Sequence, residues 1–273
     1  MMKYTGTRLI ACDLDHTLLN ESGLLDRKQE ETLRRLRNQG ILIVIASGRP
    51  LYSIQRIIPD GLYDYAVCDN GAHVYDAGNK TDLYRTLLSN EDKQILLHQM
   101  KRRHVLLAAS NDSKFIYYCQ REDKRLFDLY QNTRRLAGRL IGRDPYLYDI
   151  IPQPEETLSY PCAKFCFASV PFALRSLAAS LDPARFSPAF VSSTWLEIMP
   201  ADTDKGSGIQ KVLEKEHIDA KEAACIGDGE NDIAMTRVCG RSAAMAHGMS
   251  RMKKASDEIV TDSNLWLERF LHN

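Results

Sequence analysis

Three short apolar runs near the start of the chain are separated by amphipathic segments. The runs are residues 7–14 (TRLIACDL), 41–47 (ILIVIAS) and 64–72 (DYAVCDNGA). The second is almost continuously apolar and rich in β-branched residues, as strands in the middle of a parallel sheet are. The segments between the runs, residues 26–40 and 47–58, read as surface helices. This alternation of strands and helices predicts an α/β fold with a doubly wound parallel sheet.

The pattern changes between residues 79 and 194, where predicted strands follow one another more directly. We expect helices at residues 89–103, 121–136 and 171–181, and strands at residues 104–110, 114–120, 163–170, 184–193 and 194–199. Neighbouring strands with interspersed helices are typical of an α+β sheet with helices on one face. Residues 142–161 contain four prolines, and we interpret them as a long loop.

The alternation of helices and strands resumes after residue 200. Helices are predicted at residues 205–217 and 231–239, and strands at residues 223–227, 242–246 and 258–261. We therefore expect a core domain built from residues 1–78 and 195–273. Residues 79–194 are expected to form an inserted α+β cap domain.

Composition narrows the class of protein further. The 273 residues are 44% hydrophobic and 26% charged, which suits one large domain or two smaller ones. Lys+Arg and Asp+Glu both total 36, so no charge excess indicates binding to nucleic acid or to a membrane surface. No signal peptide is recognisable, and no apolar run reaches the roughly 18 residues of a transmembrane helix. The seven cysteines lie mostly in apolar surroundings, so we expect reduced thiols and a cytoplasmic location.

Polar residues with possible chemistry lie where the predicted strands end. Ligands of open α/β sheets bind at the carboxyl ends of the strands. The candidates are Asp13 and Asp15 after the first strand, Ser47 and Gly48 after the second, Lys205 at a helix start, and Asp228, Asn231 and Asp232 after the strand at 223–227.

The carboxylates among these candidates predict a metal site. Asp13 and Asp15 are two residues apart, so they project from the same side of an extended chain and repel each other when both are ionised. Together with Asp228 and Asp232 they suit a hard cation with oxygen ligands, and Mg²⁺ is the usual one for phosphate chemistry. The EF-hand calcium pattern fails when counted from either Asp13 or Asp228, because the required Gly and Glu are absent.

Phosphoryl transfer accounts for the whole set of candidates. Asp13 is then a carboxylate nucleophile that forms an aspartyl-phosphate. Asp15 protonates the leaving alcohol and afterwards deprotonates the water that hydrolyses the intermediate. The phosphate oxygens are held by Ser47, the Gly48 amide, Lys205 and Asn231.

These motifs resemble those of the haloacid dehalogenase-like (HAD) phosphatases. The resemblance rests on DLDHT at 13–17, SGR at 47–49, Lys205 and GDGENDIAM at 227–235. It implies a Rossmann-like core, Mg²⁺ as cofactor and attack through the first aspartate. A large α+β cap between the second and third motifs, the NGA segment at 70–72 and the T-x-S-N near the end are similar to the Cof-type branch, class IIB. That branch implies a small phosphorylated metabolite, such as a sugar phosphate, as substrate. It also implies that residues 1–78 and 195–273 form the catalytic core and that the cap at 79–194 governs substrate specificity.

Two positions depart from the family pattern. His16 stands where the family usually has glycine, and we interpret it as a bystander, with a place beside the leaving group as the alternative. The sequence MAHG at 245–248 replaces a common Gly-Asn-Ala run. We interpret Arg49 as the partner of a core acid and not as a phosphate ligand.

The expected function is a Mg²⁺-dependent phosphomonoesterase, monomeric or homodimeric, acting on a small phosphorylated metabolite. One alternative is a phosphomutase that returns the phosphoryl group of Asp13 to a sugar. Another is a catalytically silent metabolite-binding or regulatory protein on the same scaffold. Release of phosphate without an acceptor sugar distinguishes the first from the other two.

Overall fold

The computed structural model describes residues 6–103, 106–110, 115–118, 129, 132, 148–151 and 153–271. Contacts divide the chain into two compact units. The first, the core unit, consists of Met1–Arg85 and Thr203–Asn273, and the second, the inserted unit, is Thr86–Asp202. The boundaries lie later in the chain than residues 79 and 194, because a hairpin extends the core sheet and residues 195–200 belong to the second sheet.

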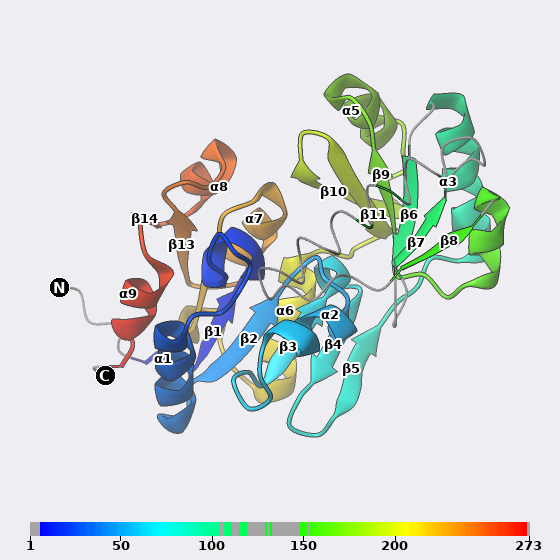
Figure 1. Ribbon diagram of the computed structural model, residues 1–273. Coiled ribbons are helices and arrows are strands. Elements are labelled where there is room, and N and C mark those ends of the chain that lie inside the picture. The colour runs from blue at the N-terminus through cyan, green and yellow to red at the C-terminus, as the bar shows by residue number, and fades with distance from the viewer. Residues whose placement is uncertain are drawn as a thin grey trace. The chain divides into compact units, whose positions relative to one another are not determined.

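The core unit contains an eight-stranded sheet in the order β14-β13-β12-β1-β2-β3-β4-β5 (Figure 1). Its strands are β1 (Leu9–Cys12), β2 (Leu42–Ala46), β3 (Tyr65–Cys68), β4 (His73–Asp76), β5 (Thr81–Arg85), β12 (Ala223–Gly227), β13 (Arg241–Met245) and β14 (Glu258–Val260). The strands from β14 to β3 are parallel, and β4 and β5 are antiparallel. The strand order reverses direction beside β1, and this switch point is where such sheets bind ligands.

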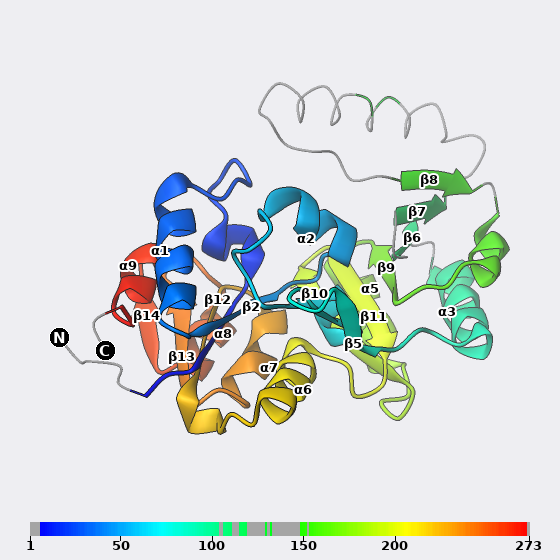
Figure 2. The ribbon, with the colours of Figure 1, turned by 90° about the horizontal axis from the view of Figure 1, so that it is seen from below.

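Alternating residues of the core strands enter two hydrophobic layers. Ile10 and Cys12 of β1 pack in one layer with α1 (Arg27–Asn38), α2 (Leu51–Ile57) and α9 (Ser263–Glu268). Leu9 and Ala11 pack in the other layer with α6 (Lys205–Glu216) and α7 (Ile233–Thr236). Figure 2 shows α1 and α2 on one side of the sheet and α6 and α7 on the other. A further short helix, α8 (Ser250–Ala255), follows β13. Both faces are thus covered, which explains why β1 and β2 are nearly continuous apolar runs.

The inserted unit contains a six-stranded sheet in the order β10-β11-β9-β6-β7-β8. Its strands are β6 (Leu106–Ser110), β7 (Phe115–Tyr118), β8 (Tyr148–Ile151), β9 (Lys164–Ala168), β10 (Phe186–Ser192) and β11 (Trp195–Pro200). The helices α3 (Asn90–Arg103) and α5 (Pro171–Ala179) pack on the face that carries Leu107, Phe165 and Ile198. This arrangement agrees with the predicted α+β pattern, and the predicted fold class is confirmed.

Some predicted elements were wrong or incomplete. The prolyl segment 142–161 is not only a loop, since it contains β8 and the 3₁₀ turn η3 (Pro154–Ser159). The strand β8 has only four residues and pairs in parallel with β7, so its own pattern is too short to reveal it. The helix predicted at 231–239 is shorter, with a 3₁₀ turn, η5 (Glu230–Asp232), before α7. The helix predicted at 121–136 lies largely outside the described residues.

Two expectations from composition can be compared with the structure. The six cysteines among the described residues, including Cys12 and Cys225, are buried thiols. Within the described ranges, no helix combines the length and apolar character needed to cross a bilayer.

Candidate active site

Asp13 occupies the carboxyl end of β1, at the switch point of the core sheet. Four fully buried residues, Leu9–Cys12, precede it, and its backbone N–H donates to the carbonyl of Ile226 on β12 at 3.0 Å. The backbone of Asp13 is therefore fixed between β1 and β12, and the residue is only 5% exposed.

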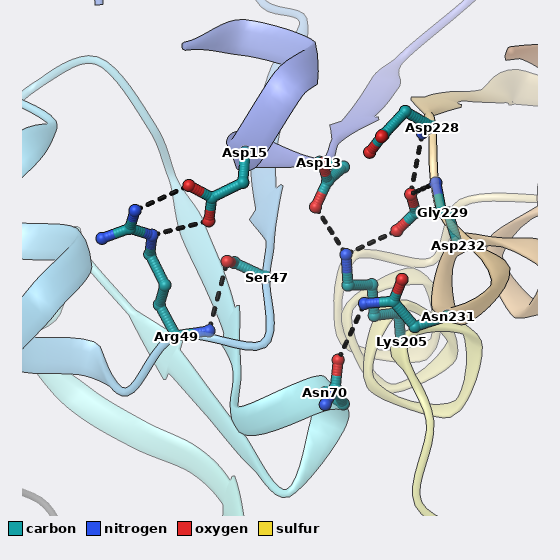
Figure 3. Close-up of polar contacts among 10 residues, drawn as sticks. All are labelled: Asp13, Asp15, Ser47, Arg49, Asn70, Lys205, Asp228, Gly229, Asn231 and Asp232. Carbon is teal, nitrogen blue, oxygen red and sulfur yellow. Dashed lines mark hydrogen bonds and ion pairs between the residues drawn. The ribbon is translucent and has the colours of Figure 1, made fainter. Parts of the chain in front are cut away.

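Lys205 reaches Asp13 from the first turn of α6. Its ammonium group donates to Oδ1 of Asp13 at 2.5 Å and also to Oδ1 of Asp232, and the residue is 1% exposed (Figure 3). The start of α6 is fixed by a capping box, in which the Asp204 carboxylate accepts from the Ser207 N–H at 2.7 Å and the Ser207 hydroxyl accepts from the Asp204 N–H at 3.0 Å. A lysine in a first helical turn is unfavourable to the helix dipole, and two carboxylates offset that cost here.

Asp228 and Asp232 come from the loop that follows β12. The second carboxylate oxygen of Asp232 accepts the N–H groups of Asp228 at 2.9 Å and Gly229 at 2.8 Å. A Cβ atom at Gly227 would lie 2.5 Å from that oxygen, so the close approach requires glycine. The loop thus closes around Asp232 and presents Asp228 at the end of the sheet (Figure 3).

Three carboxylates form an acidic cluster that could hold a metal ion. Asp13, Asp228 and Asp232 each offer one oxygen, and these oxygens lie within 4.8 Å of one another. Oxygen ligands at this spacing suit a hard divalent cation. Asp15, also predicted to contact the metal, does not join this cluster in the described part of the chain.

Burial and charge shift the titration of the acidic cluster. Burial and the nearby Asp232 raise the pKa of the Asp13 carboxyl well above its ordinary value, although Lys205 acts in the opposite direction. Burial and Asp232 also raise the pKa of Asp228 to about 6. Burial alone would lower the pKa of Lys205, but the charges of Asp13 and Asp232 raise it. One lysine therefore does not offset the repulsion of three carboxylates, and a bound cation would.

Asp15 forms a bidentate ion pair with Arg49. The guanidinium group donates to the two carboxylate oxygens at 2.7 and 2.6 Å, and also to the Ser53 hydroxyl at 3.1 Å. Burial alone would raise the pKa of Asp15, but the hydrogen bonds and charge of Arg49 lower it below its ordinary value. The expectation that Arg49 pairs with an acid is met, and that acid is the proposed acid–base residue.

The residues predicted to bind phosphate lie at neighbouring strand ends. Ser47 is 1% exposed at the end of β2, its hydroxyl accepts the Arg49 N–H at 3.2 Å, and Gly48 follows it directly. Asn231 lies on η5, where its amide donates to Oδ1 of Asn70 at 3.2 Å. Asn70 is absent from the predicted set, although the NGA segment that contains it was part of the family resemblance.

The chain matches a known protein family over most of its length. The model of the haloacid dehalogenase-like hydrolases matches residues 10–265, almost the whole chain. The chain belongs to this family. The predicted family is therefore confirmed, and the chain is a HAD-like hydrolase.

Relatives of this HAD-like hydrolase extend over nearly its full length. A phosphatase of Bacillus subtilis strain 168, 5-amino-6-(5-phospho-D-ribitylamino)uracil phosphatase YwtE, is 25% identical over an alignment 273 positions long, which covers 94% of this chain and 93% of the relative. An HMP-PP phosphatase of Klebsiella pneumoniae strain 342 is 23% identical over an alignment 250 positions long, which covers 90% of this chain and 86% of the relative. The solved structure of the HAD subclass IIB sugar phosphatase BT4131 has a TM-score of 0.76 at 18% identity and covers 93% of each chain. That last likeness concerns the fold.

The two departures from the HAD pattern lie together. His16 adopts a left-handed backbone with φ of 61°, a conformation that favours the glycine usual in this family. A ring nitrogen of His247 lies 2.7 Å from the carbonyl oxygen of His16, and both histidines are exposed. The Ser263 hydroxyl donates to the neighbouring carbonyl of Thr17 at 2.7 Å. The turn after Asp13 is thus held by residues from the C-terminal part of the chain.

Proposed function

We propose that this HAD-like hydrolase is a Mg²⁺-dependent phosphomonoesterase that works through an aspartyl-phosphate on Asp13. The observation that carries the proposal is the place of Asp13, which is buried at the end of β1 against Lys205 and beside Asp228 and Asp232. A carboxylate in such a position is a nucleophile whose negative charge needs cations to persist.

The donor set fits Mg²⁺. Asp13, Asp228 and Asp232 supply three carboxylate oxygens, and burial raises the pKa of both Asp13 and Asp228, as expected for a cluster that lacks a divalent counter-charge. When bound, the ion would neutralise charge on the phosphoryl oxygens. The role of Asp15 as a further metal contact stays a prediction.

In the first step, the free carboxylate oxygen of Asp13 attacks phosphorus. A bond forms between this oxygen and phosphorus, and the ester P–O bond breaks. Asp15 gives a proton to the departing alkoxide, so a neutral alcohol leaves. Lys205 holds the other oxygen of Asp13, which directs the attacking oxygen.

In the second step, the ionised Asp15 takes a proton from water as the water attacks phosphorus. The bond between phosphorus and Asp13 breaks, which frees inorganic phosphate. The ion pair with Arg49 favours the ionised Asp15 that this second step needs. The first step needs a protonated Asp15, so Asp15 must separate from Arg49 before the alcohol leaves.

The remaining predicted residues would hold the phosphoryl oxygens. The Ser47 hydroxyl, the Gly48 amide, the Lys205 ammonium and the Asn231 amide are donors of the kind that stabilise charge in the transition state. Their positions at the end of β2, in the first turn of α6 and on η5 after β12 support this assignment.

The substrate is proposed to be a small phosphorylated metabolite. The relatives described above are named as phosphatases of phosphorylated small organic molecules, which supports this class. The inserted unit is proposed to act as the substrate-specificity cap. A cytoplasmic location and a monomeric or homodimeric state stay predictions from the sequence.

Release of inorganic phosphate from a generic aryl phosphate, with and without Mg²⁺ and with no acceptor added, tests the proposal. The proposal expects steady release that requires the metal. If the aryl ester is inert, a panel of phosphorylated sugars and cofactors follows. Phosphate transfer that occurs only when an acceptor sugar is added would refute hydrolysis, and silence with every ester would refute the phosphatase function.

A further inference from the structure

Three consecutive residues after β3 have left-handed backbones. The φ angles are 48° at Asp69, 54° at Asn70 and 99° at Gly71. Only glycine adopts such angles without cost, and Asp69 and Asn70 are held in this conformation while 4% and 1% exposed. Strain of this kind persists where the surrounding structure over-determines it, and it is typical of functional sites.

This turn, Asp69–Gly71, contacts each of the elements that carry the proposed phosphate ligands. The Asn70 N–H donates to the Ser47 carbonyl at 3.1 Å, and the Asp69 N–H donates to the Arg49 carbonyl at 3.0 Å. A Cβ atom at Gly71 would lie 2.0 Å from the Asp204 carbonyl oxygen, so the turn packs directly on the start of α6. The turn is therefore fixed to both the Ser47 loop and the helix that presents Lys205.

The Asn70 side chain extends these contacts to the third ligand. Its Oδ1 accepts from Nδ2 of Asn231 at 3.2 Å, across 161 positions in the sequence (Figure 3). The Asn231 Oδ1 packs close to Gly229, where a Cβ atom would be 2.5 Å away. The hydrogen bond to Asn70 therefore sets the direction of the Asn231 amide nitrogen. An amide nitrogen carries two hydrogens, so one remains for a phosphate oxygen.

We infer that Asn70 is a positioning residue for phosphate binding, which acts by orienting the amide of Asn231 toward the substrate phosphate. This inference rests on the proposed function. The strained backbone of the turn is the cost of placing the Asn70 side chain between the Ser47 loop and η5. Because the Asn70 side chain accepts a hydrogen bond from Asn231, its effect on phosphate binding should pass through Asn231.

A double-mutant cycle between Asn70 and Asn231 tests this dependence. Asn70→Gly keeps a residue that tolerates the left-handed backbone and removes the acceptor. The KM for an aryl phosphate and the inhibition constant of inorganic phosphate should rise about fivefold to tenfold, the worth of one hydrogen bond. In the background of Asn231→Ala, the same Asn70→Gly change should alter neither value by more than about twofold.

Matched variants separate this effect from a general loss of structure. Lys80 also has a left-handed backbone, with φ of 56°, and is exposed in the β4–β5 turn, so Lys80→Gly should leave both constants unchanged. Asn70→Asp keeps an oxygen acceptor and tolerates the backbone, so it should retain the coupling to Asn231 even if its charge weakens phosphate binding. This variant also serves if Asn70→Gly does not fold.

Calorimetry of inorganic phosphate binding to the Mg²⁺-loaded protein measures the same double-mutant cycle without turnover. If Asn70→Gly weakens phosphate binding equally in the presence and absence of the Asn231 amide, the inference is overturned. Phosphate release by the wild type would still uphold the proposed function. A wild type that binds phosphate but hydrolyses no ester would refute the proposed function alone. A wild type that binds no phosphate would overturn the inference.

Discussion

In the proposed mechanism, Asp15 has the most demanding role of any single residue, because it must both give and accept a proton. Its carboxylate accepts two hydrogen bonds from Arg49 and is 44% exposed at the side chain. The ion pair favours the ionised form of Asp15. This form suits the proposed role of Asp15 as a base in the second step and opposes its role as an acid in the first. Arg49 should therefore influence the pH at which the reaction slows.

Arg49→Gln is predicted to move the descending limb of kcat/KM toward higher pH. The variant removes the charge that lowers the pKa of Asp15, so Asp15 stays protonated over a wider range. The measurement is a pH profile of phosphate release. Arg37→Gln is the matched control, because Arg37 forms a similar pair with Asp64, at 2.6 Å, away from the acidic cluster. An unshifted limb in Arg49→Gln would contradict the assigned role of Asp15.

The acidic cluster leads to a prediction about metal and pH. The pKa of Asp228 is raised to about 6, so the metal-free folded protein holds this proton more tightly than the unfolded chain does. That contribution to stability is present at low pH and is lost as the pH rises through about 6. A divalent cation binds the ionised carboxylate, so the stability that it adds increases as the pH rises through about 6.

Saturating Mg²⁺ should therefore raise the Tm by several degrees at about pH 7.5 and clearly less at about pH 5. Thermal melting with and without the metal measures both values. Asp228→Asn should abolish most of the rise and its pH dependence. A rise that is equal at the two pH values would show that Asp228 does not ligate the metal.

At the scale of elements, the N-cap of helix α6 fixes the position of the charged side chain that follows it. Asp204 caps α6 with a hydrogen bond of 2.7 Å to Ser207, and Lys205 follows it at once. Helix α1 begins in the same way, with Asp26 accepting the Gln29 N–H at 2.8 Å. The two caps are chemically alike, and only one of them precedes a residue of the proposed site.

Asp204→Ala and Asp26→Ala should each lower the free energy of unfolding by about 1 kcal/mol, the usual worth of an N-cap. Only Asp204→Ala should also lower kcat/KM, by about tenfold, because the start of α6 then no longer fixes Lys205. Denaturant unfolding and steady-state kinetics measure the two effects. Equal activity in both variants would show that the cap does not position Lys205.

Strand ends were the part of the site that the sequence pattern predicted well. The apolar runs ending in Asp13 and Ser47 and the run before Asp228 are central strands, and central strands have strong patterns because both faces are buried. The hairpin of β4 and β5 was not predicted. β5 has no buried residue, and short edge strands lack a clear alternation of apolar and polar residues. The expected boundary of the core domain was therefore placed before β5.

Contacts between side chains were less predictable than the strand ends. The hydrogen bond between Asn70 and Asn231 joins positions 161 residues apart, and nothing in either local sequence specifies the partner. The Arg49 pair with Asp15 similarly depends on β1 and β2 being neighbours in the sheet. Such contacts are consequences of topology, so they become visible only when the strand order is known.

At the scale of the whole molecule, each of the two units has its own hydrophobic core. The core unit has two layers around its sheet, and the inserted unit has a separate cluster beneath α3 and α5. The inserted unit also contains a buried ion pair, in which the Lys164 ammonium donates to Glu197 at 2.7 Å with side chains 1% and 7% exposed. Units with separate cores should unfold separately.

Glu197→Leu should destabilise the inserted unit by about 3–5 kcal/mol, because it removes the carboxylate that faces the buried Lys164. The double variant with Lys164→Met should recover most of that loss. In calorimetry, these variants should shift one transition, and Mg²⁺ should shift the other. A single transition that responds to both would contradict the independence of the two units.

Phosphate release from an aryl phosphate by Asp13→Asn, beside wild type and at saturating Mg²⁺, is the decisive test of Asp13 as the nucleophile. Asp60→Asn is the control, because it makes the same change at an exposed position of the core unit. We predict that Asp13→Asn loses at least about a thousandfold in kcat while it stays folded, because its carboxamide is not a nucleophile. Asp60→Asn should match the wild type. Turnover by Asp13→Asn within about tenfold of the wild type would contradict a reaction that passes through Asp13.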